Sequence, residues 1–408
     1  MAEKIAIIGA GAAGMLCAGM LTEYGFDVTV FEKNEKVGRK IAITGKGRCN
    51  LTNNCTPEDF LRNVVTNPRF MMSSLYTFTP ADTMELFEGL GVPLKTERGN
   101  RVFPVSDKAY DIVDALKKYM GTKPVNKRVS DLIIEDGHIV GVVADKKKYD
   151  FDTVVVATGG ASYPLTGSTG DGYKLAKQAG HRVTELIPSL IPMVTEEGEP
   201  AEMQGLSLKN VSLTVFDTEK NKSIFAEQGE MMFTHFGVTG PLVLSASSHM
   251  HDMKRGKYKI KIDLKPALDE KTLDTRLLSD FSKYQNKDFI NSLSDLLPSK
   301  MIPVFVKLTG IPADKKVNVI TKEERRRILE TLKGLTFTVK GFRPIAEAII
   351  TSGGVDCKEI NPKTMESKLT EGLYFAGEVI DVDAYTGGFN LQIAFSTAAA
   401  AARDIRGF

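Results

Sequence analysis

Three glycines near the N-terminus have the spacing of a dinucleotide-binding turn, in the segment Gly9-Ala10-Gly11-Ala12-Ala13-Gly14. An apolar run at 4–8 precedes them and an apolar segment at 12–24 follows, so the pattern predicts a strand, a tight turn and a helix. The first glycine permits the bend, the second lets the backbone approach a pyrophosphate, and the third lets the helix pack on the strand. The N–H groups that begin the helix then attract phosphate oxygens.

An acidic residue, Glu32, ends the next predicted strand at 27–32. A carboxylate at this point suits a bidentate hydrogen bond to the hydroxyls of an adenosine ribose. The glycines alone could form a purely structural turn. The strand, the helix and Glu32 together favour dinucleotide binding over that structural interpretation.

A second glycine-rich region near the C-terminus favours FAD over NAD. The chain has a buried-strand pattern, 154–160, and ends in Tyr374-Phe375-Ala376-Gly377-Glu378 before a helix that begins near Gly388. An acidic residue after the last strand can reach the ribityl chain, and the helix N–H groups can face the flavin N1–C2=O edge, where reduction places negative charge. No second GxGxxG occurs, so FAD is the expected cofactor, with NADH or NADPH as a transient donor that the sequence does not identify.

A basic loop, Gly38-Arg39-Lys40 followed by 45–53, lies close to the first phosphate turn in the sequence. Its basic residues and small polar side chains predict a loop that wraps the pyrophosphate and the ribityl chain. The alternative is a solvated basic loop with no ligand. Cys49 within it has no CxxC partner, which argues against disulfide-reductase chemistry and favours a small residue packed near the flavin.

Candidate proton donors for flavin chemistry are few. His235, one of five histidines, precedes a glycine turn and is the first candidate for an acid or base. The alternative role for His235 is to orient a loop between two domains. Tyr163, which follows Ala-Thr-Gly-Gly, and Tyr385, which precedes Thr-Gly-Gly, are the other candidates.

The bulk composition indicates an ordinary globular protein. Of 408 residues, 42% are hydrophobic and 25% charged, and the net charge of +2 gives no overall field favouring nucleic acid or membrane. The four cysteines lack metal-ligand or disulfide spacing, and no apolar run approaches the roughly 20 residues of a membrane span. We therefore expect a soluble, cytoplasmic protein without a metal site.

The order of predicted elements indicates an α/β fold with an insertion. Strand and helix patterns alternate in the first third, including a helix near 57–65 and a hairpin that turns at 135–137, while 223–226 and 230–234 are among several short strands after 190. Residues 268–332 are helical, and Thr321 with Glu324 predicts a capping box. The expected domains are a discontinuous Rossmann-type FAD-binding domain of the two-dinucleotide-binding flavoprotein type, an inserted antiparallel β-barrel and a small helical subdomain: 1–190 with 341–408, 191–265 with 333–340, and 266–332.

Several long segments resemble the BaiN-like family of NAD(P)/FAD-dependent oxidoreductases, some members of which are described as aminoacetone oxidases. They are GRK…TGKGRCNLTN, ATGGASYPLTGSTGDGY, FTHFGVTGP, ITSGGV and GLYFAGEVIDVDAYTGGFNLQIAFSTAAAAA, and the resemblance runs over essentially the whole chain. The resemblance implies a Rossmann-type FAD domain with an inserted barrel and a helical subdomain. It leaves two acidic residues, Glu378 and Asp381, competing for the ribityl chain.

The expected cofactor-binding residues combine the motifs with the family resemblance. They are Gly9, Gly11, Ala12, Ala13, Gly14, Glu32, Lys33, Arg39, Lys40, Gly47, Arg48, Cys49, Asn50, Val129, Ala157, Thr158, Gly159, Gly377, Glu378, Asp381, Gly388, Phe389, Asn390 and Leu391.

The resemblance implies a reductase that delivers hydride from reduced flavin N5 to a C=C bond conjugated to a carbonyl in an enone-like small molecule. The alternatives are a ribosomal RNA uridine reductase, a flavin amine oxidase and a non-catalytic FAD-stabilised binding protein. Uridine is electronically an enone, so the first two share one mechanism. For RNA, the only candidate basic surface is Arg325-Arg326-Arg327 with the region 283–300. A membrane or metal partner is not expected.

Overall fold

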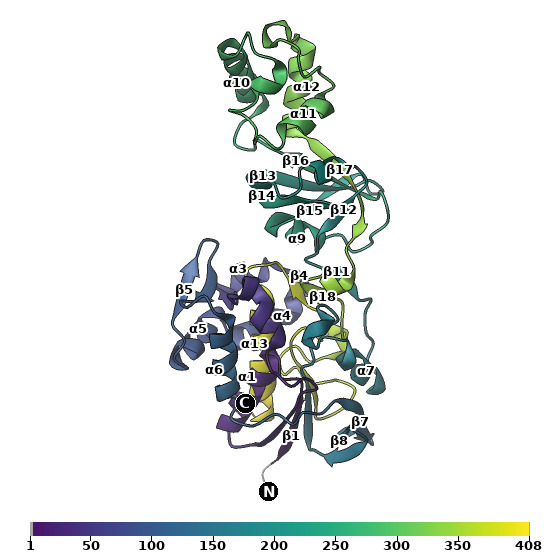
Figure 1. The fold of residues 1–408 in the computed structure, drawn as a ribbon. Helices are drawn as coiled ribbons and strands as arrows, with labels where there is room; N and C mark the ends of the chain where they lie inside the picture. The colour runs from purple at the N-terminus through teal and green to yellow at the C-terminus, as the bar shows by residue number, and fades with distance from the viewer. Residues whose placement is uncertain (1–2, 408) are drawn as a thin grey trace. The chain divides into compact units, whose positions relative to one another are not determined.

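The chain forms two compact units in the computed structural model, which describes residues 3–407 (Figure 1). The first unit comprises Met1–Ser189 and Pro344–Phe408, and the second comprises Leu190–Arg343. The second unit is therefore an insertion into the first.

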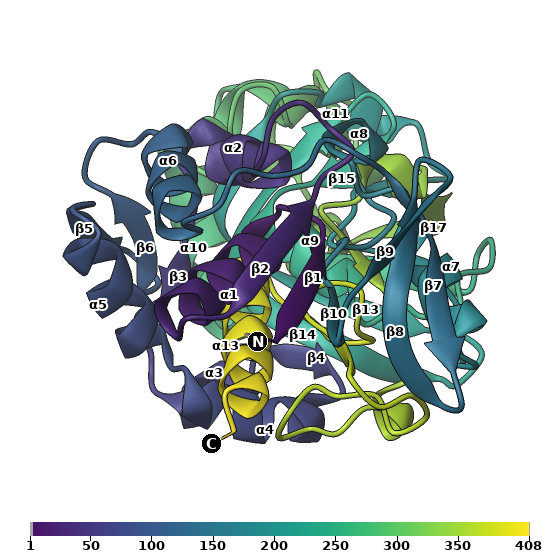
Figure 2. The ribbon, with the colours of Figure 1, turned by 90° about the horizontal axis from the view of Figure 1, so that it is seen from below.

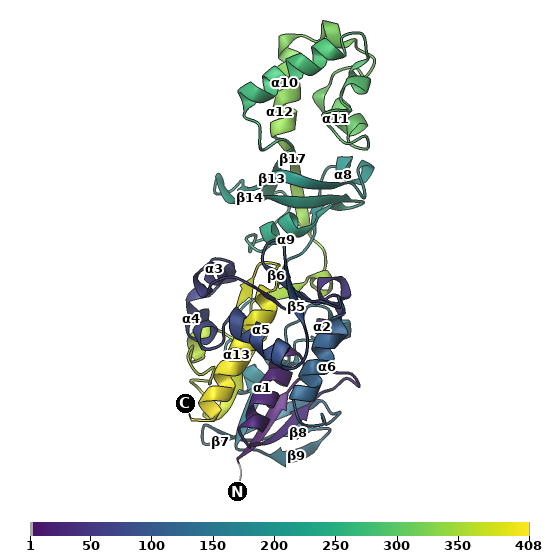
Figure 3. The same ribbon diagram turned by 90° about the vertical axis from the view of Figure 1, so that its left-hand side faces the viewer.

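A four-stranded parallel sheet is the centre of the first unit, in the order β19-β10-β1-β2. The strands are almost continuous apolar runs because both faces of a parallel sheet are covered. Two helices that each follow a glycine turn, α1 (Ala12–Glu23) and α13 (Phe389–Ile405), lie side by side (Figure 2, Figure 3). The strands are β1 (Lys4–Ile8), β2 (Asp27–Phe31), β10 (Thr153–Val156) and β19 (Leu373–Phe375).

Smaller elements surround this sheet. The helices are α2 (Arg39–Ile43), α3 (Pro57–Leu61), α4 (Pro68–Thr77), α5 (Pro80–Gly89), α6 (Ala109–Tyr119) and α7 (Asp171–Gln178). The small sheets are β3 (Thr52–Asn53) with β6 (Arg101–Pro104) and β5 (Leu94–Glu97); β7 (Val129–Glu135) with β8 (His138–Ala144) and β9 (Lys147–Asp150); β20 (Asp383–Ala384) with β4 (Val64–Thr66); and β11 (Ile187–Ser189) with β18 (Ile350–Ser352).

Two local predictions in this unit have opposite outcomes. The hairpin of β7 and β8 is confirmed, and its turn places Asp136 and Gly137 at φ 49° and 82°, which glycine and aspartate tolerate well. The predicted helix 57–65 is wrong beyond Leu61. Residues 64–66 form β4 instead, because they pair with β20 from the far end of the chain.

A closed antiparallel barrel forms the first part of the second unit, in the order β12-β15-β14-β13-β16-β17. The expected strands 223–226 and 230–234 are one continuous strand, β14. Helices α10, α11 and α12 cluster beyond one end of the barrel within this unit (Figure 1). The strands are β12 (Met193–Thr195), β13 (Ser207–Asp217), β14 (Lys222–Thr234), β15 (Gly237–Thr239), β16 (Tyr258–Asp263) and β17 (Leu335–Phe342), and the helices are α8 (Glu199–Glu202), α9 (Pro241–Ser247), α10 (Glu270–Lys283), α11 (Ile302–Thr309) and α12 (Lys322–Lys333).

The predicted capping box at the start of α12 is confirmed. Thr321 Oγ1 accepts from the Glu324 N–H at 3.2 Å, and the Glu324 carboxylate accepts from the Thr321 N–H at 2.8 Å. Thr321 and Glu324 are only three residues apart in the chain, so the sequence alone could specify this contact.

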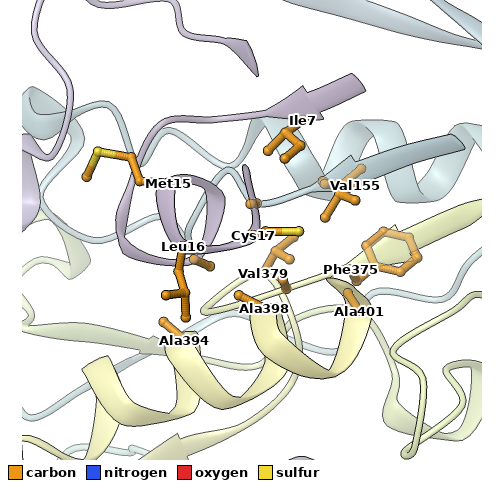
Figure 4. Close-up of a cluster of buried hydrophobic side chains, with 14 of the residues drawn as sticks. Ile7, Met15, Leu16, Cys17, Val155, Phe375, Val379, Ala394, Ala398 and Ala401 are labelled. Carbon is orange, nitrogen blue, oxygen red and sulfur yellow. The ribbon is translucent and has the colours of Figure 1, made fainter. Parts of the chain in front are cut away.

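Small residues let α1 and α13 pack closely on the sheet. Ala394, Ala398 and Ala401 of α13 lie in the same buried cluster as Leu16 and Cys17 of α1 (Figure 4). The alanine run at the end of the chain is therefore the contact surface of α13.

Within residues 3–407, no helix combines the length and hydropathy needed to cross a membrane.

Gly14 tests how closely α1 packs on the glycine turn that follows β1. A methyl group on Gly14 would lie 1.9 Å from the carbonyl oxygen of Gly9, whereas a methyl group on Gly89, at the end of α5, would meet nothing within 4 Å. We expect Gly14→Ala to lower the free energy of unfolding by about 1–3 kcal/mol through overpacking. Gly89→Ala, the control, should be neutral or stabilise by up to about 1 kcal/mol. Urea denaturation of the flavin-free protein measures both, and equal effects would contradict the close contact.

Candidate functional site

The three glycines of the first turn have separate structural roles. Methyl groups on Gly9 and Gly14 would collide with backbone, the first at 2.6 Å from the Ala157 carbonyl oxygen. A methyl group on Gly11 would meet nothing within 4 Å, and no side chain caps the N-terminus of α1 there. The open space in front of Gly11 therefore leaves the first N–H groups of α1, including those of Ala12 and Ala13, available to an anion.

Glu32 is held at this turn by backbone and side-chain donors. Its Oε2 accepts from the Ala10 N–H at 2.9 Å, and its Oε1 accepts from the N–H and the side-chain amide of Asn34 at 2.8 and 2.7 Å. The carboxylate is half-buried and cannot swing freely. It is thus oriented before any ribose binds.

Lys33 belongs to an ion-pair cluster next to Glu32. Its ammonium lies 2.7 Å from Asp171 Oδ2, and Arg128 donates to the other oxygen of Asp171 at 2.5 Å. Val129, the first residue of β7, is buried directly after Arg128. Asp171 on α7 therefore ties the strand ends β2 and β7 together at the expected adenosine end of the site.

Three of the four cations of the basic loop, Arg39, Lys40 and Arg48, have different partners. Arg39 donates to Asn34 Oδ1 at 2.9 Å, and Lys40 lies 2.6 Å from Glu378 Oε2. Arg48 pairs with carboxylates on and beside the β5–β6 hairpin, Glu97 and Asp107, and its guanidinium lies 4.2 Å from the ring centre of Phe103. Arg39 is thus linked to Asn34, which holds Glu32, and Lys40 to Glu378, while Arg48 anchors the loop to the β5–β6 hairpin.

The two residues that flank Arg48 have different surroundings. Cys49 is fully buried, and burial raises the pKa of its thiol to about 12, so a reactive thiolate is disfavoured. Gly47, at φ 82°, sits in open surroundings two residues earlier. The structure thus gives Cys49 the environment of a packing residue.

The N-terminus of α13 receives the basic loop. A methyl group on Gly388 would lie 2.3 Å from the Thr52 carbonyl, so only glycine fits there. In the amide orientation that satisfies both groups, Asn50 accepts from the Gly388 N–H at 3.0 Å and donates to the Thr52 carbonyl at 3.2 Å. Within residues 3–407, no side chain caps the helix itself, so its first-turn N–H groups are left for other acceptors. The residues of this turn are Phe389, Asn390 and Leu391.

Asn390 is occupied within its own loop. Its side-chain amide donates to the carbonyls of Ala384 and Tyr385 at 2.8 and 3.2 Å and accepts from the Ala384 N–H at 3.0 Å. The residue therefore fixes the turn that leads into α13 rather than offering a free side chain.

Gly377 lies where the last strand meets both glycine-led helices. A methyl group there would lie 3.1 Å from Ala13 of α1 and 3.6 Å from Ala394 of α13. The next residues are the two competing carboxylates. Glu378 is half-buried and paired with Lys40, whereas Asp381 is 9% exposed and has no ion pair among residues 3–407.

The strand β10 leads into a further part of the site. Ala157 packs against Gly9, and Gly159 takes φ 72° to turn the chain away. Between them, Thr158 Oγ1 is buried without a hydrogen-bond partner in the described part of the chain. A buried hydroxyl without a partner is uncommon and marks a position where a ligand or water completes the structure.

The three proton-donor candidates do not share one unit. Tyr163 is half-buried and has left-handed backbone, φ 50°, and Tyr385 is half-buried with its N–H donating to the Asn63 carbonyl at 3.0 Å. Both belong to the first unit. His235 is exposed in the turn between β14 and β15 of the second unit. Its ring packs edge-on against that of Phe236, with 4.9 Å between the ring centroids.

These residues fit FAD. The uncapped α1 N-terminus with open space at Gly11 suits a pyrophosphate, Glu32 suits a ribose, and the unpartnered Thr158 hydroxyl lies on the turn after β10. Across residues 3–407, no group of three or more histidine, cysteine or acidic side chains could hold a metal ion. Fold and site together define an FAD-dependent oxidoreductase with a Rossmann-type nucleotide domain.

The chain belongs to the HI0933-like family, because residues 3–404 match the description "HI0933-like protein Rossmann domain". It is 34% identical to the ribosomal RNA dihydrouridine synthase of Haemophilus influenzae, over 98% of this chain and 97% of that protein. It is 29% identical to the 3-dehydro-bile acid delta(4,6)-reductase of Clostridium scindens, over 98% of each chain.

Among solved structures, the 3-ketosteroid delta1-dehydrogenase of Sterolibacterium denitrificans has the same fold. The TM-score is 0.52 at 12% identity, and the alignment covers 99% of each chain. The predicted fold class and the resemblance to the BaiN-like flavoproteins are confirmed.

Several residues that complete the site were not singled out from the sequence. Asn34 and Asp171 hold Glu32 and Lys33, and Ser162 and Thr351 contact Glu378. All but Asn34 lie in segments that carry the family resemblance. The family resemblance therefore marked these segments, but no local spacing rule assigned a role to the individual residues within them.

The pH dependence of stability tests the position of Asp381. Burial, with the nearby carboxylates Asp383 and Asp356 adding to it, raises the pKa of Asp381 above its ordinary value of 3.8. A carboxyl group with a raised pKa in the folded state stabilises the fold at low pH, and this contribution is lost as the pH rises through the raised value. Asp381→Asn removes the titration, so its melting temperature should rise relative to the natural chain as the pH increases above 3.8.

The measurement is the melting temperature of the flavin-free protein between about pH 4 and about pH 8. Asp114→Asn, on the exposed side of α6, controls for the loss of one negative charge. A difference between Asp381→Asn and the natural chain that does not change with pH would contradict the burial effect.

Proposed function

We propose that this chain is an FAD-dependent reductase of a C=C bond that is conjugated to a carbonyl. The observation that carries the proposal is the full-length similarity to two proteins whose names describe such bonds. Dihydrouridine is uridine reduced at C5=C6, which is conjugated to C4=O. A delta(4,6) 3-dehydro steroid likewise has its double bonds conjugated to the 3-oxo group.

The proposed cofactor contacts follow the first unit from one end of the site to the other. When bound, FAD supplies hydride transfer. The first turn of α1 binds the pyrophosphate and Glu32 the ribose, while Lys40 and Glu378 face the ribityl region. The N-terminus of α13 stabilises negative charge on the N1–C2=O edge. NADH or NADPH is the proposed transient donor.

A small enone is the first candidate substrate. Three of the basic residues that could form an RNA-binding stripe are paired within their own unit: Arg325 lies 2.7 Å from Asp274, Arg326 lies 2.9 Å from Glu330, and Lys283 lies 2.7 Å from Asp295. Paired cations contribute less to phosphate binding than free ones.

A uridine of ribosomal RNA is the second candidate substrate. The similarity to the Haemophilus influenzae synthase supports it, since that identity of 34% exceeds the 29% to the bile-acid reductase. The same hydride acceptor, a carbon β to a carbonyl, serves both candidates.

Anaerobic half-reactions test the proposal. We expect NADH or NADPH to reduce the bound flavin, and an enone or a uridine-containing ribosomal RNA to reoxidise it much faster than an amine-derived imine or oxygen does. Stopped-flow absorbance of the flavin measures each step. Reduction of the flavin by an amine, with no reduction by either nicotinamide, would favour an oxidase, and a flavin that no donor reduces would favour a non-catalytic role.

Tyr163 is the proposed proton donor, because it directly follows Ser162, which contacts Glu378, and because it has the left-handed backbone that concentrates at functional sites. We expect Tyr163→Phe to slow reoxidation by the enone or RNA by about 10²-fold or more. Reduction by the nicotinamide should be unchanged. Tyr76→Phe, on the exposed side of α4, is the matched control. Normal reoxidation in Tyr163→Phe would pass the role to Tyr385 or His235.

A further inference from the structure

A polar cluster surrounds Glu378 and brings together four segments that are far apart in the sequence. Lys40 on α2 lies 2.6 Å from Glu378 Oε2. Ser162, in the loop after β10, donates to Glu378 Oε1 at 3.0 Å, and the backbone N–H of Thr351 on β18 donates to the same oxygen at 2.9 Å. Ser162 is fully buried and Thr351 is 1% exposed.

The hydroxyl of Ser162 connects the two charged groups. It accepts from the Lys40 ammonium at 2.8 Å while it donates to Glu378. The carbonyl of Ile349 lies farther from this hydroxyl, at 3.4 Å, so the proton goes to the carboxylate. Ser162 therefore fixes the position of both members of the ion pair.

The neighbouring glycine leaves room for this arrangement. A methyl group on Gly160 would lie 2.8 Å from Thr351 Oγ1 and 2.9 Å from Glu378 Oε1. The Ala161 N–H donates to Thr351 Oγ1 at 2.9 Å, which holds the loop that carries Ser162. The Gly-Gly turn thus has two roles: it turns the chain at the end of β10, and it leaves the space that Thr351 and Glu378 occupy.

Glu378 and Lys40 each have one hydrogen-bonding position that the protein does not fill within residues 3–407. A carboxylate oxygen accepts about two hydrogen bonds, and an ammonium donates three. Oε1 of Glu378 is filled by Ser162 and Thr351, while Oε2 has only Lys40 within residues 3–407. Lys40 uses two donors there, on Glu378 and Ser162. One acceptor on Oε2 and one donor on Lys40 remain.

We infer that Ser162 and Thr351 are positioning residues that hold Glu378 and Lys40 in the orientation that binds the polar middle of FAD. The remaining acceptor suits a ribityl hydroxyl, and the remaining donor suits a phosphate or carbonyl oxygen of the cofactor. The inference rests on the assignment of FAD to this site. A half-buried ion pair adds little stability by itself, so the value of the cluster lies in its orientation.

Titration of flavin-free protein with FAD, followed by flavin fluorescence, tests the inference. We expect Ser162→Ala to weaken FAD binding roughly tenfold, the effect of one hydrogen bond to a charged group. Thr351→Val keeps the backbone N–H that donates to Glu378 and removes only the acceptor for the Ala161 N–H, so it should weaken FAD binding by roughly two- to tenfold, the effect of one neutral hydrogen bond. Thr351→Ser keeps the acceptor for Ala161 and should restore most of the affinity. Ser74→Ala and Thr153→Val, buried residues of the same unit outside the cluster, are matched controls.

A double-mutant cycle separates positioning from general loosening. If Ser162 acts through Glu378, then Ser162→Ala should have a much smaller effect in the Glu378→Gln background. Melting temperatures of the flavin-free variants identify any variant that does not fold. If Ser162→Ala does not fold, the FAD affinity of Thr351→Val tests the inference instead. Unchanged FAD affinity in both variants, or an undiminished Ser162→Ala effect beside Glu378→Gln, would overturn the inference. Failure of the natural chain to bind FAD would instead refute the cofactor assignment.

Discussion

The close approach of α1 and α13 is the constraint on which the site depends. Each helix begins at a glycine turn that no side chain caps, and Gly377 lies in contact distance of both, near Ala13 and Ala394. Larger side chains at these positions would separate the helices. Because glycine and alanine occupy these positions, α1 and α13 pack closely, and each begins with an uncapped N-terminus that has partial positive charge.

The charged groups of the site are committed to partners within the protein. Glu32 is held by Ala10 and Asn34, and Lys40 is held by Glu378 and Ser162. A side chain that is already oriented loses little conformational entropy when a ligand arrives. The site is therefore preorganised by hydrogen bonds rather than built from free surface charge.

Local patterns in the sequence predict what neighbouring residues determine. The glycine turn, the β7–β8 hairpin and the Thr321 capping box each depend on residues within a few positions, and all three form as expected. The same rules fail where pairing comes from far along the chain. The predicted helix 57–65 ends early, and residues 64–66 form β4 because β20 supplies the hydrogen-bond partners.

In the candidate site, too, local motifs predict the positions of residues, whereas the contacts between distant segments are not predicted. The positions of Glu32 and Gly388 follow from motif spacing, but their partners do not. Ser162 lies 216 residues from Glu378 along the chain, and Arg48 finds Glu97 on a separate hairpin. No local rule links such pairs, so the sequence indicates that Arg48 is near the site without indicating which group it binds.

The antiparallel pair of β11 and β18 has a consequence for how such proteins diversify. The chain leaves the first unit after Ser189 and returns at Pro344, and Ser189 lies opposite Ile350 in the pair. An insertion whose ends are already tied together adds little closure entropy to its host. Recombination at this junction can exchange the whole inserted unit while the first unit, with both glycine turns, is kept. The exchange has one condition, since Thr351 lies opposite Pro188 and any new insert has to preserve that register.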